Sequence, residues 1–328
     1  MLNITVDGGG TKLLVLVFDE NHKPLAVGRG LSVNLLFATP ENVNNTIVSC
    51  INDVMEQIPD NYKESGNIVF ENAYITMVGS THILQDYLLT RSTVKNIRQF
   101  SEGETGIFAG ALSDSGLLAL AGTGSDCFLV KAGHTYSTIG GWGAVLGDEG
   151  SGYYLGREAL IAAIRSFDKR GPKTIIEDII VEDWKLKRMW ELVKIYSSPT
   201  QRRDVALATK SLSKAIKLGD EVAINIVKKA AAELALQAIT LLKREPAVMT
   251  MKMTVSGGAW KTSKIMINSF VELVKNNYPE IEFVYPHFEP VISGVIYDIL
   301  KNKETIDEFT LNKLKKEFNE YVFRTDDD

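Results

Sequence analysis

The chain has 328 residues, a length typical of two domains or of one large one. Hydrophobic residues make up 45% of it and charged residues 23%, so the chain can bury a sizeable core. The formal net charge is −5 and there is no long basic run. This argues against nucleic acid as a partner, because phosphate backbones are bound mainly through clustered Lys and Arg.

The two cysteines and the N-terminal residues limit the cellular context. Cys50 and Cys127 stand in unlike surroundings without metal-ligand spacing, which argues against a disulfide framework or an iron–sulfur cluster and fits a reducing compartment. Residues 1–7 lead straight into strand-like sequence and lack the charged and apolar regions of a signal peptide. No apolar stretch approaches the length of a membrane span. We therefore expect a cytoplasmic protein with no membrane partner.

The first hundred residues alternate strand and helix patterns. Thr39 followed by Pro40 is typical of a helix N-terminus, and apolar residues at spacings of three and four over 43–58 predict an amphipathic helix there. Further helices are expected between the last two strands and after Glu104. Short β-rich runs predict five strands, at 2–6, 13–18, 25–28, 73–78 and 97–100.

The same order of elements begins again near residue 116. A helix-rich stretch follows the restart, and its clearest member is expected over 221–243. The strands predicted here are 117–121, 127–130, 136–139, 248–255 and 282–285. This repeat predicts an α/β protein with two copies of one unit and a cleft between them, divided into domains 1–115 and 116–328. This prediction includes the option that the C-terminal helix packs back on the first domain.

Each predicted unit carries a glycine-rich turn between its first two strands. Glycines let backbone N–H groups approach an anion, and a following hydroxyl or lysine adds to phosphate binding. Asp7, at the end of the first strand, is suited to hold Mg²⁺, which prefers carboxylate and phosphate oxygens. The alternative is an ordinary hairpin with a capping Asp. The candidate phosphate-binding residues are Gly9, Gly10, Thr11 and Lys12 in the first turn and Gly122, Thr123, Gly124 and Ser125 in the second.

A second glycine-rich stretch surrounds two adjacent acids. Carboxylates framed by glycines commonly accept hydrogen bonds from sugar hydroxyls, which makes Gly141, Trp142, Asp148 and Glu149 candidate substrate-binding residues. The alternative is that the acids favour the N-terminus of a following helix that Ser151 caps. Gly257 and Gly258, between a strand and a helix, could lie against a flat nucleotide ring or form an ordinary turn.

Together these motifs resemble the N-acetylglucosamine kinase group of the wider BadF/BadG/BcrA/BcrD ATPase-like family. The resemblance rests on the two glycine hairpins, on Gly140-Gly141-Trp142-Gly143 and on Gly147-Asp148-Glu149-Gly150-Ser151, in this order. It implies the actin-like ATPase fold, with two RNase H-like domains, and transfer of the γ-phosphate of ATP to the 6-hydroxyl of an amino sugar. It also implies that Asn34, otherwise a turn residue, and Asp148 bind sugar hydroxyls, that Gly257 and Gly258 border the adenosine, and that a homodimer forms.

One position departs from the family pattern. Kinases of this group carry a catalytic Asp just before the last helix of the first domain, where this sequence has Gly103. Glu102 and Glu104 flank it, so one of them is the expected base, with Glu102 favoured. The open alternatives are an ATPase that drives electron transfer into a dehydratase or reductase, which two isolated cysteines disfavour, and a non-catalytic sugar-binding regulator.

Overall fold

The computed structural model describes residues 1–64, 66–198, 201–246, 251–302 and 306–328, which form two compact units. The first unit comprises Met1–Gly116, Val130–Thr135 and Tyr285–Phe323, and the second comprises Leu117–Leu129, Tyr136–Val284 and Arg324–Asp328. The division differs from a single split at residue 115 because a long C-terminal segment and the tip of one hairpin belong to the first unit. None of the helices in the described part of the chain combines the length and apolarity that a membrane crossing requires.

The first unit is built on one mixed sheet. Its strands are β1 (Leu2–Gly8), β2 (Lys12–Asp19), β3 (Pro24–Leu31), β4 (Lys63–Glu64), β5 (Asn67–Met77) and β6 (Thr93–Phe100). Their order is β3-β2-β1-β5, with both β4 and β6 paired to β5. β1 to β3 form an antiparallel meander, and β5 and β6 continue the sheet in parallel with β1. The carboxyl ends of β1, β5 and β6 therefore meet at one edge.

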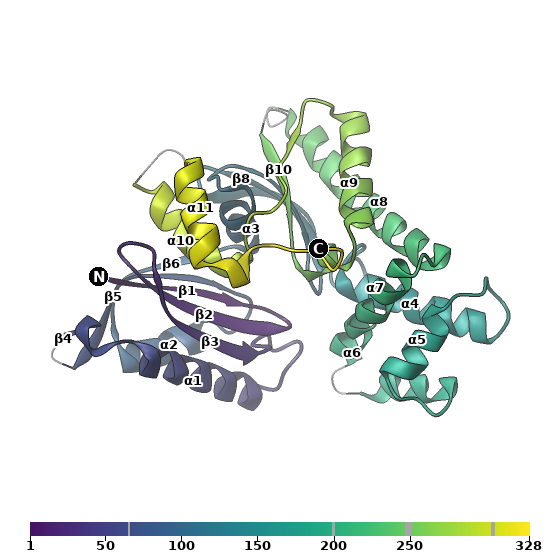
Figure 1. Cartoon of the computed structure of the whole chain (residues 1–328), viewed down its shortest axis with the longest axis horizontal. Helices are drawn as coiled ribbons and strands as arrows, with labels where there is room; N and C mark the ends of the chain where they lie inside the picture. The colour runs from purple at the N-terminus through teal and green to yellow at the C-terminus, as the bar shows by residue number, and fades with distance from the viewer. Residues whose placement is uncertain (65, 199–200, 247–250, 303–305) are drawn as a thin grey trace. The chain divides into compact units, whose positions relative to one another are not determined.

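Helices cover both faces of this sheet, as the alternation of side chains along β2 requires (Figure 1). Leu13, Val15 and Val17 join a core with the first two helices, whereas Leu14, Leu16 and Phe18 join a second core with the C-terminal segment. The helices are α1 (Pro40–Gln57), α2 (Thr81–Arg91), α3 (Glu102–Ala111), α10 (Ser293–Leu300) and α11 (Glu308–Glu317). Burial of this second face explains why the chain returns to the first unit at its end.

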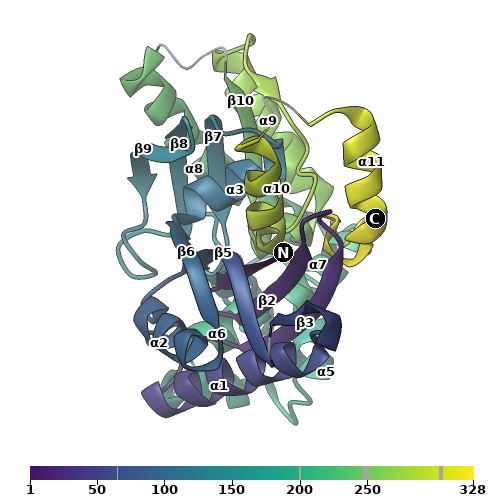
Figure 2. The ribbon, with the colours of Figure 1, turned by 90° about the vertical axis from the view of Figure 1, so that its left-hand side faces the viewer.

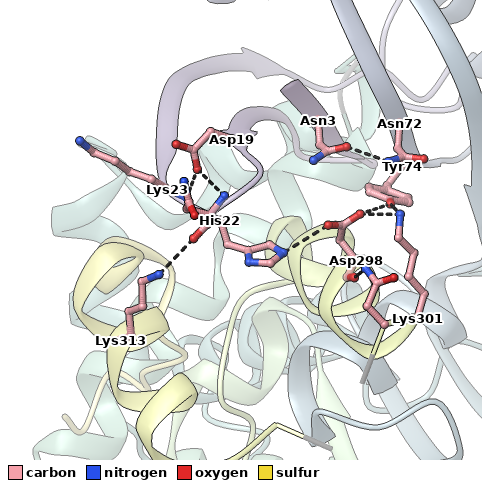
Figure 3. A network of polar contacts seen from close by, with 11 residues as sticks. Asn3, Asp19, His22, Lys23, Asn72, Tyr74, Asp298, Lys301 and Lys313 are labelled. Carbon is pink, nitrogen blue, oxygen red and sulfur yellow. Dashed lines mark hydrogen bonds and ion pairs between the residues drawn. The ribbon is translucent and has the colours of Figure 1, made fainter. Parts of the chain in front are cut away.

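A buried carboxylate ties the C-terminal segment to the sheet (Figure 3). Asp298 of α10 accepts hydrogen bonds from the Tyr74 hydroxyl of β5 (2.5 Å) and from His22 Nε2 (3.2 Å), and it forms an ion pair with Lys301 (2.7 Å). Burial alone would raise the pKa of Asp298, but these three partners outweigh it and lower the pKa to about 2. The carboxylate is therefore charged and saturated with donors.

The second unit repeats the strand order of the first. Its strands are β7 (Gly116–Ala121), β8 (Ser125–Lys131), β9 (His134–Gly140), β10 (Lys252–Ser256) and β11 (Glu282–Phe283). They lie in the order β9-β8-β7-β10-β11, and Figure 2 shows the first four side by side. This matches β3-β2-β1-β5-β6, so the predicted α/β class and the internal repeat are confirmed. Residues 248–250 of the strand predicted at 248–255 lie outside the described residues.

The helices of the second unit follow from recognisable local signals. They are α4 (Gly152–Phe167), α5 (Ile176–Asp183), α6 (Gln201–Leu207), α7 (Thr209–Lys217), α8 (Glu221–Arg244) and α9 (Lys264–Asn277). Ser151 caps α4 by accepting the Tyr154 N–H (3.1 Å), and Asp220 caps α8 by accepting that of Ala223 (2.8 Å). The predicted cap at Ser151 and the predicted long helix are thus confirmed.

Candidate active site

The first glycine hairpin joins β1 to β2 in the first unit. The Gly9 N–H donates to the Lys12 carbonyl (3.0 Å), which closes the turn, and the Gly9 carbonyl accepts the Val33 N–H (3.3 Å). A Cβ added at Gly9 would meet no atom within 4 Å, so the backbone there is open to an approaching group. Thr11 and Lys12 are exposed beside it. The hairpin thus offers the backbone access and the positive charge that a phosphate group requires.

Asp7 lies next to this hairpin, at the carboxyl end of β1. It pairs in register with Thr76 of β5, which pairs with Phe100 of β6, just before α3. Burial raises the pKa of Asp7 to about 6, Lys12 opposes the rise and Glu289 adds to it. The described residues contain no group of three or more side chains able to hold a metal ion by themselves. A carboxylate at a phosphate hairpin still fits Mg²⁺, which retains waters and shares phosphate oxygens.

Asn34 lies on the loop that the hairpin holds. Its side-chain oxygen accepts the Leu36 N–H (2.9 Å), which is the turn chemistry expected of a loop asparagine. Its side-chain NH₂ group has no hydrogen-bond partner in the part of the chain that the structure describes. Asn34 can therefore donate to a ligand oxygen while its own oxygen shapes the loop.

The two glutamates at the start of α3 have different environments. Glu102 is exposed on the first turn of the helix, whereas Glu104 is buried, at 8% exposure. Glu104 accepts the Thr135 N–H with one carboxylate oxygen (3.0 Å) and the Ser101 N–H with the other (3.4 Å). Ser101 in turn accepts the Glu104 N–H (3.1 Å), which completes a capping box. Both carboxylate oxygens of Glu104 are thus occupied by backbone N–H groups, which argues against the expectation that Glu104 could be the base.

The second glycine loop, in the second unit, is bound directly to the acidic segment that follows β9. The Ser125 hydroxyl donates to the Glu149 carbonyl (2.8 Å), and the Gly152 N–H donates to the Gly122 carbonyl (2.8 Å). The Ser125 N–H points at the Asp148 carboxylate (3.4 Å). The two predicted motifs of this unit therefore form one site, although 23 residues separate Ser125 from Asp148.

Asp148 occupies a conformation that few side chains adopt. Its φ is +59°, a left-handed value that Asp tolerates better than most residues, and it is only 9% exposed. A Cβ added at Gly124 would lie 3.1 Å from the Asp148 carboxylate, so the glycine lets the acid approach the loop. Burial raises the pKa of Asp148, while N–H groups of Ser125 and Gly143 lower it. Trp142 stands 76% exposed on the same segment, and Glu149 follows Asp148 directly.

Asp126 is a neighbour that the sequence analysis missed. Burial raises its pKa to about 6, and the charge of Asp148 adds to the rise. A Cβ added at Gly141, whose φ is +73°, would lie 2.1 Å from an Asp126 carboxylate oxygen, so only glycine fits there. Within the described ranges, no donor reaches the Asp126 carboxylate. Its position directly after Ser125 was visible in the sequence, but a carboxylate that follows the glycines was not expected to hold a metal and received no role.

Gly257 also approaches the second loop. Its φ is +107°, and an added Cβ would lie 2.3 Å from the Ala121 carbonyl oxygen, so this position requires glycine. Gly258, which follows, has open space where a Cβ would be. The structure thus brings both glycines to the end of β10, beside Gly122. In the second unit, Asp148, Glu149 and Gly257 thus lie against the glycine loop from Gly122 to Ser125.

The repeated sheet, with a glycine loop and a carboxylate in each copy, defines a two-unit protein of the α/β class. Residues 4–297 match the model of the BadF/BadG/BcrA/BcrD ATPase family, and the chain belongs to this family.

Named relatives are amino-sugar kinases. An N-acetylmuramic acid/N-acetylglucosamine kinase of Clostridium acetobutylicum is 29% identical over 89% of this chain and 96% of its own length. An N-acetyl-D-glucosamine kinase of Dictyostelium discoideum is 26% identical over 92% of this chain and 98% of its own. Among solved structures, a putative N-acetylglucosamine kinase from Porphyromonas gingivalis matches with a TM-score of 0.69 at 16% identity, covering 93% of this chain and all of that one. The last likeness confirms the fold.

Proposed function

We propose that this chain is an ATP-dependent kinase that phosphorylates the 6-hydroxyl of an amino sugar such as N-acetylglucosamine or N-acetylmuramic acid. The observation that carries the proposal is the pairing of a glycine loop with a desolvated carboxylate in each unit, Asp7 in the first and Asp148 in the second. Such carboxylates lower stability and are retained where they bind a ligand. The names of the relatives support an amino sugar as the acceptor.

The roles follow from what each group can donate or accept. The first hairpin, with Thr11 and Lys12, and the second, from Gly122 to Ser125, would hold the phosphates. Asp7 would hold Mg²⁺, which neutralises charge on the transferring phosphoryl group. Gly257 and Gly258 would border the adenosine.

The acceptor sugar would be bound by polar side chains. Asn34 would donate to a sugar oxygen and Asp148 would accept from a sugar hydroxyl, with Gly141, Trp142 and Glu149 around it. Glu102, exposed at the start of α3, would orient the 6-hydroxyl and accept its proton. We also propose a cytoplasmic, homodimeric enzyme with the small sugar as its partner and no nucleic acid.

The cysteines bear on the alternative of an electron-transferring ATPase. Cys50 on α1 and Cys127 on β8 are both buried, and burial raises the pKa of Cys50 to about 12 and that of Cys127 further. Iron–sulfur ligation needs thiolates. These two thiols are therefore poor ligands, and the kinase is the better-supported function.

The test is the release of ADP with Mg·ATP and a panel of N-acetylglucosamine, N-acetylmuramic acid, glucosamine and glucose. We expect an amino sugar to accelerate ADP release far above the rate without sugar. Equal rates with and without every sugar would indicate an ATPase of another kind. Sugar binding without any ADP release would indicate a regulator.

A further inference from the structure

The first turn of α3 is held in a closed ring of hydrogen bonds. The ring consists of the capping box between Ser101 and Glu104, the bond from the Thr135 N–H to Glu104, and the bond between the Ser101 and Thr135 hydroxyls (2.6 Å). Thr135 comes from the tip of the β8–β9 hairpin, which belongs to the first unit. An ordinary capping box involves only residues of its own helix terminus. The two hydrogen bonds from Thr135 therefore add a contact with a distant hairpin to this one.

The hairpin tip is itself fixed next to the same turn. The Arg98 guanidinium, on β6 just before α3, donates to the Gly133 carbonyl (2.9 Å), and the Gly133 N–H donates to the Asp114 carbonyl (2.7 Å). A tip held at both ends of α3 cannot slide along the helix. Thr135 therefore presents its N–H and its hydroxyl at a defined place.

We infer that Glu104 and Thr135 are positioning residues that aim Glu102 at the acceptor hydroxyl, an inference that rests on the proposed function. Glu102 directly follows Ser101 and stands two residues before Glu104, so a member of the ring lies on each side of it along the chain. Fixing the backbone on each side of Glu102 restricts the directions its carboxylate can take. Restriction of this kind raises kcat, because a misplaced general base loses most of its effect.

The ring also suits a base with a long side chain. Glu102 is a glutamate, whose side chain has one methylene more than that of an aspartate. A longer side chain has an additional rotatable bond, so it needs a more rigid backbone to hold its carboxylate in one orientation. The added tie from Thr135 supplies that rigidity.

The experiment is a double-mutant cycle on kcat. Thr135→Val removes the hydroxyl but keeps the shape and the N–H, and Thr135→Ser is the matched control that keeps the hydroxyl. Glu104→Gln keeps one acceptor and replaces the other with a donor that faces an N–H group. Each variant is measured alone and combined with Glu102→Gln, with thermal unfolding recorded in parallel.

We expect Thr135→Val to lower kcat about 2- to 10-fold and Glu104→Gln about 10-fold, with the KM values for ATP and sugar within about twofold of wild type. Thr135→Ser should match the wild type. In the Glu102→Gln background, Thr135→Val should change kcat less than about 1.5-fold.

Equal losses in both backgrounds, or lower thermal stability with unchanged kcat, would overturn the inference. If Glu102→Gln keeps wild-type turnover, the positioning role of Glu104 and Thr135 is also wrong. Sugar-dependent ADP release by the wild type would then still support the kinase, so the two failures are distinguishable. If Glu104→Gln does not fold, the Thr135 variants decide alone.

Discussion

Two regions of the molecule bury carboxylates in opposite ways. In the first unit, Asp298 is surrounded by Tyr74, His22 and Lys301, and its pKa falls to about 2. In the second unit, Asp126 and Asp148 are desolvated close to each other, and both pKa values rise, that of Asp126 to about 6. The difference lies in the partners, because burial raises the pKa in all three cases. A carboxylate saturated with donors stabilises the fold, whereas one left short of donors is available to a ligand.

The largest stability effect is expected at Asp298. Asp298→Asn removes the charge that pairs with Lys301, so we expect a loss of about 2–4 kcal/mol in the free energy of unfolding at pH 7. Because the folded pKa is lowered, this contribution is present above pH 3.8 and is lost as the pH falls toward 2. Chemical denaturation measures it. An unchanged denaturation midpoint at pH 7 would contradict the claim that Asp298 stabilises the fold.

The next effect is kinetic. Asp148→Asn keeps a side chain that tolerates positive φ but removes the charged acceptor, so we expect kcat/KM for the sugar to fall about 10- to 100-fold. Asp7→Asn is the matched variant and should impair the use of Mg·ATP with every acceptor. Steady-state kinetics with each substrate varied separates the two. If Asp148→Asn has normal sugar kinetics, the assignment of this carboxylate to the acceptor is wrong.

The smallest effect is expected at Asp126 and has the opposite sign. A carboxyl whose pKa is raised binds protons more tightly in the folded state, so its ionisation destabilises the fold as the pH rises from 3.8 to about 6. The difference between these values, at 1.36 kcal/mol per pH unit, sets an upper bound of about 3 kcal/mol, and we expect about 1.

Asp126→Asn should therefore stabilise the protein at pH 8 and have almost no effect at pH 4, as measured by urea unfolding at each pH. Glu272→Gln, which replaces an exposed acid on α9, is the control. If Asp126→Asn instead destabilises the protein at pH 8, the Asp126 carboxylate stabilises the fold, as that of Asp298 does.

Local patterns predicted most of the fold. The glycine turns, the proline at the start of α1 and the serine cap of α4 act within a few residues, so their consequences can be derived from short stretches of sequence. The repeat of the whole unit was evident because the same turn recurs between similar strands. The return of residues 285–323 to the first unit was only partly anticipated, since it depends on which face of a distant sheet lacks a cover.

The site was predicted less completely than the fold. Glu102 and Glu104 are equivalent in sequence terms, and only the Ser101-x-x-Glu104 spacing of a capping box hinted that the second is structural. Asp126 gains its significance from Asp148 and from the missing side chain of Gly141. Electrostatic coupling between residues so far apart in the chain has no local signature.

The chemical identity of the product tests the central claim most directly. Phosphorus NMR of a reaction with Mg·ATP and N-acetylglucosamine or N-acetylmuramic acid should show ADP and a new sugar phosphomonoester in equal amounts, coupled to the protons on C6. ADP with inorganic phosphate alone, with no sugar ester for any acceptor of the panel, would contradict the assignment of this chain as an amino-sugar kinase.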